Sequence, residues 1–279
     1  MGIDYEVEYD NRARVPEHPE IFARWAREAE AYRAEAGHEG RAEFGILYGG
    51  TPRQSIALYF SGAGRQAPLA TFVHGGWWRS LDPWLFSHMA RGLNAHGVTV
   101  AVVGYDLCPL VSIADIVAQI RQSCLHLWRR LEKRMLVVGH SAGGHLGACM
   151  LATDWPALAP GAPADLVPAA CAISGVFDLA PIVTVSANAD LRLTEAEARR
   201  LSPLHWPAPD GRVLDLVVGA DESGEFLRQS RAIMEAWQGP VQTRHEAVTG
   251  ANHFSVLDPL ADPDSALVLR LADLARRIS

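Results

Sequence analysis

Short strand-like runs alternate with longer segments of helical periodicity along most of this chain, and this alternation constrains its fold more than any other feature. The strand-like runs, mostly apolar and rich in β-branched residues, lie at about 43–48, 55–60, 69–73, 98–104, 135–138, 169–173, 213–219 and 241–248. The helical patterns lie at 84–96, 112–131, 142–151, 223–237 and 264–277. Continuously apolar strands are typical of a sheet buried on both faces. The order predicts one α/β domain over residues 1–279, with a mostly parallel sheet and helices on both faces.

Two segments stand outside this alternation. Residues 18–36 carry apolar side chains at spacings of three and four. This predicts a helix within an N-terminal extension of about 1–40 that packs on the main body. Residues 179–207 contain a short helical piece at 194–201 and prolines at 203 and 207. Excursions of this kind often lie over strand ends, so we expect a lid or pocket wall, the alternative being a plain long connection.

A candidate nucleophile lies in the pentapeptide Gly139-His140-Ser141-Ala142-Gly143, which fits the pattern G-x-S-x-G. A strand-like run precedes it and a helical pattern rich in small residues follows, as in the nucleophile elbow of the α/β-hydrolase fold. The serine of an elbow occupies a strained turn that lifts its hydroxyl above the sheet, and small neighbours let strand and helix approach closely. We therefore predict an α/β-hydrolase fold with Ser141 as nucleophile.

The segment HGGWW at 74–78 closes a strand-like run upstream of the nucleophile. Its glycines let the main chain pass close to a substrate, so that backbone N–H groups can stabilise the oxyanion of acyl transfer. We assign the loop donors to Gly76 and Trp77, with the pair open by one residue, and a further donor to Ala142, which follows the nucleophile. Trp78 is a candidate substrate-binding wall for an aryl or acyl group, the alternative being that it packs in the core.

A general base and an acid must follow the nucleophile, because the triad of this fold runs in the order Ser, acid, His. Of two late histidines, His245 lies inside a predicted strand, whereas His253 lies in a turn after that strand. We predict His253 as the base, since a base must reach over the serine from a loop. Asp221 and Glu222 both follow the strand at 213–219, and either could orient the imidazole.

Several motifs occur together and in one order over about 70–255: HGGWW, GHSAGGH, SGVFDL at 174–179, ESGEF at 222–226 with RQS at 228–230, and NHF at 252–254. Together they resemble the arylformamidase, or kynurenine formamidase-like, branch of the α/β hydrolases. Members of this branch typically carry an acid directly before the Ser of the ESGEFxRQS pattern. The resemblance therefore implies Glu222 as the acid, although Asp is commoner there. It also implies hydrolysis of an N-formyl aryl amide or a small carboxylic ester through an acyl-enzyme.

Composition restricts the remaining functional classes. The net charge is −7 and no block of Lys and Arg occurs, so we expect no nucleic-acid partner. The four cysteines are scattered in apolar segments, which predicts buried thiols in a reducing compartment. The N-terminus lacks the pattern of a secretory signal and no run is long enough to span a membrane, so we expect a cytoplasmic protein with no membrane partner.

The expected partner is a small-molecule substrate, with no cofactor and no metal site, and a homodimer is left open. No HExxH or paired histidine spacing occurs among the 11 histidines. Two alternatives to the predicted formamidase function remain open. One is a general carboxylesterase without formamidase activity. The other is a non-catalytic binding protein of the same fold, against which the intact serine, histidine and carboxylate argue.

Overall fold

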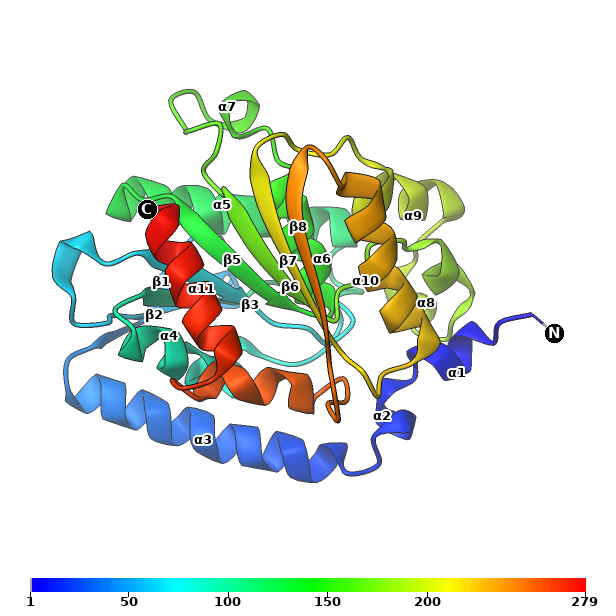
Figure 1. Ribbon diagram of the computed structural model, residues 1–279, viewed down its shortest axis with the longest axis horizontal. Helices are drawn as coiled ribbons and strands as arrows, with labels where there is room; N and C mark the ends of the chain where they lie inside the picture. The colour runs from blue at the N-terminus through cyan, green and yellow to red at the C-terminus, as the bar shows by residue number, and fades with distance from the viewer. Residues whose placement is uncertain (1) are drawn as a thin grey trace.

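The computed structural model describes residues 2–279, except the side chain of Arg65. It contains an eight-stranded sheet in the order β1-β2-β4-β3-β5-β6-β7-β8 (Figure 1). β1 and β2 pair antiparallel, β2 pairs antiparallel with β4, and the remaining pairs are parallel. The strands are β1 Ala42–Leu47, β2 Ser55–Tyr59, β3 Leu69–Val73, β4 Thr99–Val103, β5 Met135–His140, β6 Ala169–Ile173, β7 Arg212–Gly219 and β8 Val241–Val248. The predicted fold class is confirmed.

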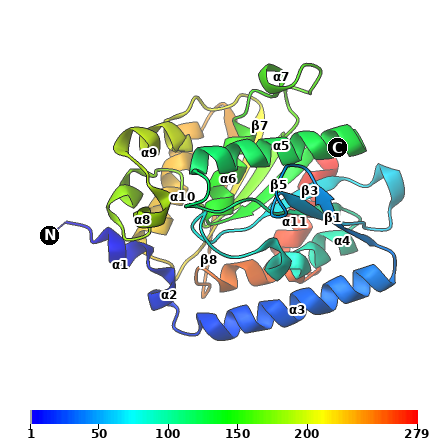
Figure 2. The ribbon, with the colours of Figure 1, turned by 180° about the vertical axis from the view of Figure 1, so that it is seen from behind.

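Helices cover both faces of the sheet. α5 (Ile113–Leu131), α6 (Ala142–Leu151) and α10 (Gly224–Trp237) contribute to one apolar core with the side chains of one sheet face. The second core lies on the opposite face and is covered by α3 (His18–His38), α4 (Arg91–Ala95) and α11 (Ala266–Arg277). Figure 1 shows α11 in front of the sheet, whereas Figure 2, from behind, shows α5 and α6 in front. Alternate strand residues enter alternate cores, as the pleat requires.

Two 3-10 helices take part in the second core, η2 Pro83–Ala90 and η5 Ser255–Ala261. The pattern at 84–96 predicted a single helix there, but most of that stretch is η2, and only α4 is α-helical. Pro83 occupies the first turn and Asp82 caps it by accepting from the Trp84 N–H at 3.0 Å. The apolar side chains are buried in either helix type, so periodicity alone did not separate them.

The N-terminal extension folds as α1 (Tyr5–Tyr9), α2 (Asn11–Arg14) and α3. The predicted apolar spacing of three and four in α3 matches its buried residues, which include Trp25, Ala29 and Tyr32. α1 lies beside α10 and near α8 (Asn188–Leu191), as both ribbon views show. Residue 1 of the predicted extension lies outside the described residues.

The segment 179–207 forms short helices: η3 Ala180–Thr184, α8, α9 Glu195–Leu201 and η4 Pro203–His205. The remaining short helices are η1 Gly64–Gln66 and α7 Trp155–Leu158.

All four cysteines, Cys124 among them, are buried and unpaired. Burial raises the pKa of the Cys124 thiol to about 12, so it is uncharged at neutral pH. Across residues 2–279, no helix has both the length and the apolar character needed to cross a bilayer.

Candidate active site

The predicted nucleophile lies in a sharp turn between strand and helix. Ser141 follows the last residue of β5 and precedes α6, with φ 55° and ψ −116°, a strained conformation for a residue other than glycine. Its N–H donates to the Ile173 carbonyl at 2.8 Å, which fixes the turn on the neighbouring strand. A Cβ at Gly143 would lie 2.0 Å from the Val73 carbonyl oxygen, so only glycine fits there. The close packing that the elbow motif requires is therefore present.

The loop after β3 approaches the nucleophile from the other side. A Cβ on Gly75 would lie 2.8 Å from the Cβ of Ser141, and Gly76 has φ 106°. The N–H groups of Gly76 and Trp77 have no acceptor among the described residues. Ala142 is the first residue of α6, where N–H groups have no partner inside the helix. These three amides are thus free to receive a negatively charged oxygen.

The predicted base and one of the two candidate acids are in direct contact. Nδ1 of His253 lies 2.6 Å from Oε2 of Glu222, and both side chains are buried. Oε1 of the same carboxylate accepts from the Ser174 hydroxyl at 2.5 Å and from the Gly219 N–H at 2.7 Å. The side chain of Glu222 therefore folds back toward the end of β7, which lets a Glu occupy this position.

The alternative acid points elsewhere. Asp221 is exposed, and its N–H donates to the Ala251 carbonyl at 3.1 Å. This bond, with that from the Ala220 N–H to the Val248 carbonyl at 2.8 Å, joins the turn after β7 to the loop that carries the histidine. Asp221 thus helps to hold the two loops together through its backbone, while Glu222 contacts the imidazole.

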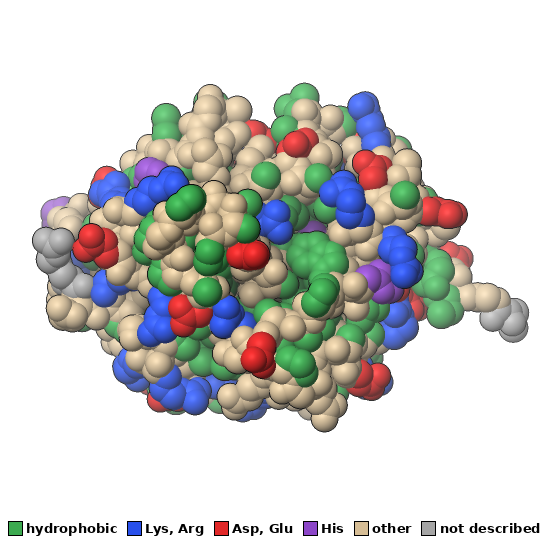
Figure 3. Space-filling model, turned by 90° about the horizontal axis from the view of Figure 1, so that it is seen from above, with side chains coloured by type: hydrophobic (Ala, Val, Ile, Leu, Met, Phe, Trp, Pro, Cys, Tyr) green, Lys and Arg blue, Asp and Glu red, His purple; other side chains and the backbone are tan. Residues whose placement is uncertain are grey.

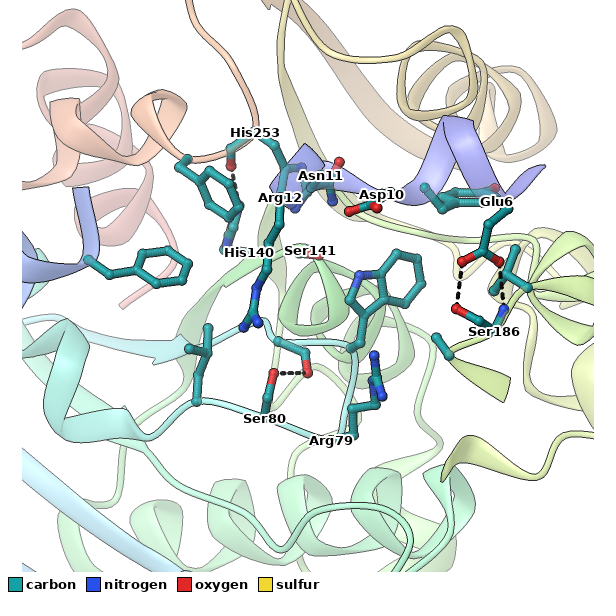
Figure 4. Close-up of a pocket in the computed structure, with 18 of the residues that line it drawn as sticks. Glu6, Asp10, Asn11, Arg12, Arg79, Ser80, His140, Ser141, Ser186 and His253 are labelled. Carbon is teal, nitrogen blue, oxygen red and sulfur yellow. Dashed lines mark hydrogen bonds between the residues drawn. The ribbon is translucent and has the colours of Figure 1, made fainter. Parts of the chain in front are cut away.

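Sequence reasoning missed the role of His140, which it treated only as a variable position of the elbow. The His140 Nε2 lies 2.8 Å from the backbone oxygen of His253, and the two rings are 4.8 Å apart (Figure 4). Burial lowers the pKa of His140, so the ring is neutral and Nε2 is the donor to that carbonyl. His140 therefore holds the predicted base over the elbow. No sequence signal indicates where this side chain points.

The side chains of the two tryptophans in this loop lie in different places. Trp77 lines the pocket that contains Ser141 and His253. Trp78 is fully buried in the core and packs edge-on against His145 at 5.1 Å. Trp78 is therefore not among the pocket residues, which corrects the assignment of this residue to substrate binding. Both have positive φ, so the loop does not alternate its side chains as a strand would.

The pocket has a volume of about 350 Å³, at the lower end of the range for small-molecule sites. Six of the residues that line it are aromatic: Tyr9, Phe22, Trp25, Trp77, Phe86 and Phe254. Val185, Ser186 and Ala187 from the segment 179–207 also line it, as a pocket wall would. On the face seen from above, basic and acidic side chains lie interspersed with hydrophobic ones (Figure 3).

The N-terminal extension contributes more to this pocket than its sequence indicated. Glu6, Tyr9, Asp10, Asn11 and Arg12 all line it. These residues are separated from the predicted nucleophile by more than a hundred positions, and the local pattern of α1 and α2 carries no sign of that contact. No group of three or more His, Cys, Asp or Glu side chains within residues 2–279 is arranged to hold a metal ion.

Comparison with known proteins shows where the chain belongs. The kynurenine formamidase of Salmo salar is 32% identical over 207 residues, which are 71% of this chain and 69% of the relative. The chain belongs to the kynurenine formamidase family of α/β hydrolases. The kynurenine formamidase of Danio rerio is 29% identical over 234 residues, 80% of this chain and 78% of that protein. No family profile matches the chain.

Solved structures agree with the fold of this formamidase family member. A thioesterase candidate from Silicibacter sp. TM1040 is 32% identical, with a TM-score of 0.86 over 96% of this chain and 98% of that one. The esterase of Pyrobaculum calidifontis, 15% identical, has a TM-score of 0.72 over 100% of this chain and 99% of its own, and shows the fold alone. The relatives and the solved structures thus agree on a hydrolase of the α/β-hydrolase fold.

Proposed function

We propose that this chain hydrolyses N-formyl aryl amides through Ser141, His253 and Glu222. The observation that carries the proposal is the 2.6 Å contact between Glu222 and Nδ1 of His253, in a pocket that also contains the serine of a strained elbow. A carboxylate on Nδ1 fixes the tautomer whose Nε2 accepts a proton, and it stabilises the imidazolium that forms. The order of the three residues is that of this fold.

In the proposed mechanism, His253 takes the proton of the Ser141 hydroxyl, whose oxygen attacks the formyl carbon. The negative charge that develops on the carbonyl oxygen is received by the N–H groups of Gly76, Trp77 and Ala142. His253 then gives its proton to the nitrogen of the aryl amine, which leaves as the C–N bond breaks. Water, deprotonated by the same histidine, attacks the formyl ester, so that formate leaves and Ser141 regains its proton.

The lining of the pocket supports an aryl leaving group. Six aromatic residues surround a small cavity, and aromatic walls favour flat, apolar groups through edge-to-face and stacked contacts. Tyr9 packs edge-on against Trp77 at 5.6 Å, so these two rings form a continuous surface. The relatives named kynurenine formamidase, at 32% and 29% identity, support a formyl group as the acyl part.

The experiment that tests this proposal compares kcat/KM for N-formyl-kynurenine with that for p-nitrophenyl acetate. We expect the formamide to be the better substrate by at least about tenfold, with formate and kynurenine formed in equal amounts. Hydrolysis of the ester alone would overturn the formamide assignment and leave a carboxylesterase. No turnover of either, with tight binding of an aryl ligand, would indicate the binding-protein alternative.

A thioester is a second candidate substrate, favoured by one specific observation. The Silicibacter sp. TM1040 protein, at 32% identity, is a thioesterase candidate. Attack on a thioester uses the same serine and the same oxyanion donors, because only the leaving atom differs. S-phenyl thioacetate, added to the comparison, separates the two candidates: a kcat/KM above that of the formamide by tenfold or more would favour the thioester.

A further inference from the structure

Four charged side chains line the pocket, and three of them already have partners. Both carboxylate oxygens of Glu6 accept from Ser186, at 2.6 Å from its N–H and 2.5 Å from its hydroxyl. Asp10 caps α2 by accepting from the Ala13 N–H at 3.0 Å. Arg79 forms an ion pair with Asp190 at 2.6 Å on the rim of the pocket. The fourth charged group is Arg12.

Arg12 has neither a hydrogen bond nor an ion pair with any described residue. Its guanidinium carbon lies 5.9 Å from the ring centroid of Phe22. Figure 4 shows the side chain leaving α2 and pointing toward the side of the pocket that carries Ser80. A charged group left unpaired in a substrate pocket is available to a charged substrate. A guanidinium fits a carboxylate with two parallel hydrogen bonds, which is the strongest such pairing.

The segment that carries Arg12 is fixed at several points. The Glu8 carboxylate accepts from the Glu225 N–H at 2.9 Å, at the start of α10. The Tyr9 hydroxyl donates to Glu225 at 3.1 Å and accepts from Gln229 at 2.9 Å. The Tyr9 ring is buried against Phe226, which in turn packs on His253 at 4.5 Å. Arg12 therefore projects from a support that is joined to the element beside the predicted base.

We propose that Arg12 binds a carboxylate on the leaving-group side of the substrate, and so selects acidic aryl amides over neutral ones. This inference rests on the proposed function for its reaction, and it adds the class of substrate. Because the arginine acts on a part of the substrate remote from the scissile bond, its contribution falls mainly on binding, hence on KM.

The test uses a matched pair of substrates that differ only in charge, N-formyl-kynurenine and its α-carboxamide. We expect the native protein to prefer the acid in kcat/KM. Arg12→Gln should lower kcat/KM for the acid by about 10- to 100-fold, the size of a hydrogen bond to a charged group, with most of the change in KM. The same variant should leave the carboxamide within about twofold of its native value.

Two further variants separate the role of this guanidinium from general effects. Arg12→Lys keeps the charge but not the planar pair of donors, and should retain part of the preference. Arg14 is an exposed arginine of the same short helix, but it does not line the pocket. Arg14→Gln should therefore leave kcat/KM for both substrates unchanged. An equal loss on both substrates in Arg12→Gln, or an unchanged preference, would overturn the proposal.

A second pair keeps this test independent of the formamide assignment. The acetate esters of 4-hydroxyphenylacetate and of 4-hydroxyphenylacetamide also differ only in a leaving-group carboxylate. If the formamides are not hydrolysed but the esters are, the proposed formamidase function fails, and the preference for the acidic ester must still depend on Arg12. Ester hydrolysis with a preference that Arg12→Gln does not alter would overturn the inference on its own.

Discussion

Glu222 contacts Nδ1 of His253 with one carboxylate oxygen, at 2.6 Å, while its other oxygen accepts two hydrogen bonds. This division holds the carboxylate at both of its oxygens. It also explains how Glu substitutes for the shorter Asp that is commoner in related motifs. The longer side chain folds back so that the Gly219 N–H meets Oε1, and Oε2 reaches the histidine.

Glu222→Gln should reduce kcat by about 10³- to 10⁴-fold, because an amide cannot stabilise the imidazolium and can impose the wrong tautomer. Asp221→Asn should leave kcat within about twofold, since that side chain is exposed. Steady-state kinetics on both purified variants, with melting temperatures as a control for folding, checks this. A larger loss in Asp221→Asn would assign the acid to the other residue.

Ser174→Ala should lower kcat by about tenfold, because it removes one of two donors that hold Oε1 of Glu222. The serine acts through the carboxylate, so this loss should disappear when Glu222→Gln is already present. A double-mutant cycle on kcat measures the coupling between the two positions. Additive losses would show that Ser174 affects the site by another route.

Gly75→Ala should lower kcat/KM by at least about 100-fold. The added Cβ would lie 2.8 Å from the Cβ of Ser141 and 2.9 Å from the His140 carbonyl oxygen. The loop after β3, which carries the proposed oxyanion donors, must then move away from the elbow. Gly50→Ala is the matched control, because its Cβ would meet nothing within 4 Å. Activity close to native in Gly75→Ala would place the oxyanion donors elsewhere.

Stability should fall as the pH is lowered from about 6.5, and His145 should contribute to this. Burial lowers the pKa of His145 to about 4, so the unfolded chain binds more protons than the folded one between the two pKa values. The free energy of unfolding should therefore drop by about 2 kcal/mol for this histidine between pH 7 and pH 5.

His145→Gln removes the titrating ring and keeps a donor for the Leu201 carbonyl, which the ring contacts at 2.8 Å. Urea unfolding at the two pH values should show a smaller pH-dependent loss in this variant than in the native protein. His38→Gln, at an exposed position near the end of α3, should change nothing. An unchanged pH dependence in His145→Gln would mean that other groups produce it.

The sheet could be predicted closely from the sequence. β3 and β6 begin and end where the apolar runs do, because each run is preceded by a proline and followed by a polar residue. The elbow and His253 could also be predicted from the sequence, since both depend on local motifs in a fixed order. Local patterns were less informative at 84–96, where buried residues fit a 3-10 helix as well as an α-helix.

The walls of the pocket could not be predicted in this way. Trp77 and Trp78 are adjacent, and only the positive φ values of the loop determine that one enters the pocket and the other the core. Tyr9 reaches Glu225 across 216 positions of sequence, so the place of the N-terminal segment depends on tertiary contacts. Side-chain direction in irregular segments has no periodic signature, which is why Arg12 and His140 were missed.

The most direct test of the proposed function is the turnover of N-formyl-kynurenine by the native protein and by Ser141→Ala, measured side by side. We expect the native protein to release kynurenine and formate. We expect the variant to lose about 10⁴-fold or more in kcat, because the remaining members of a triad cannot act without the nucleophile. Circular dichroism should show the same folded state in both. Formamide hydrolysis that persists in folded Ser141→Ala would contradict the central claim.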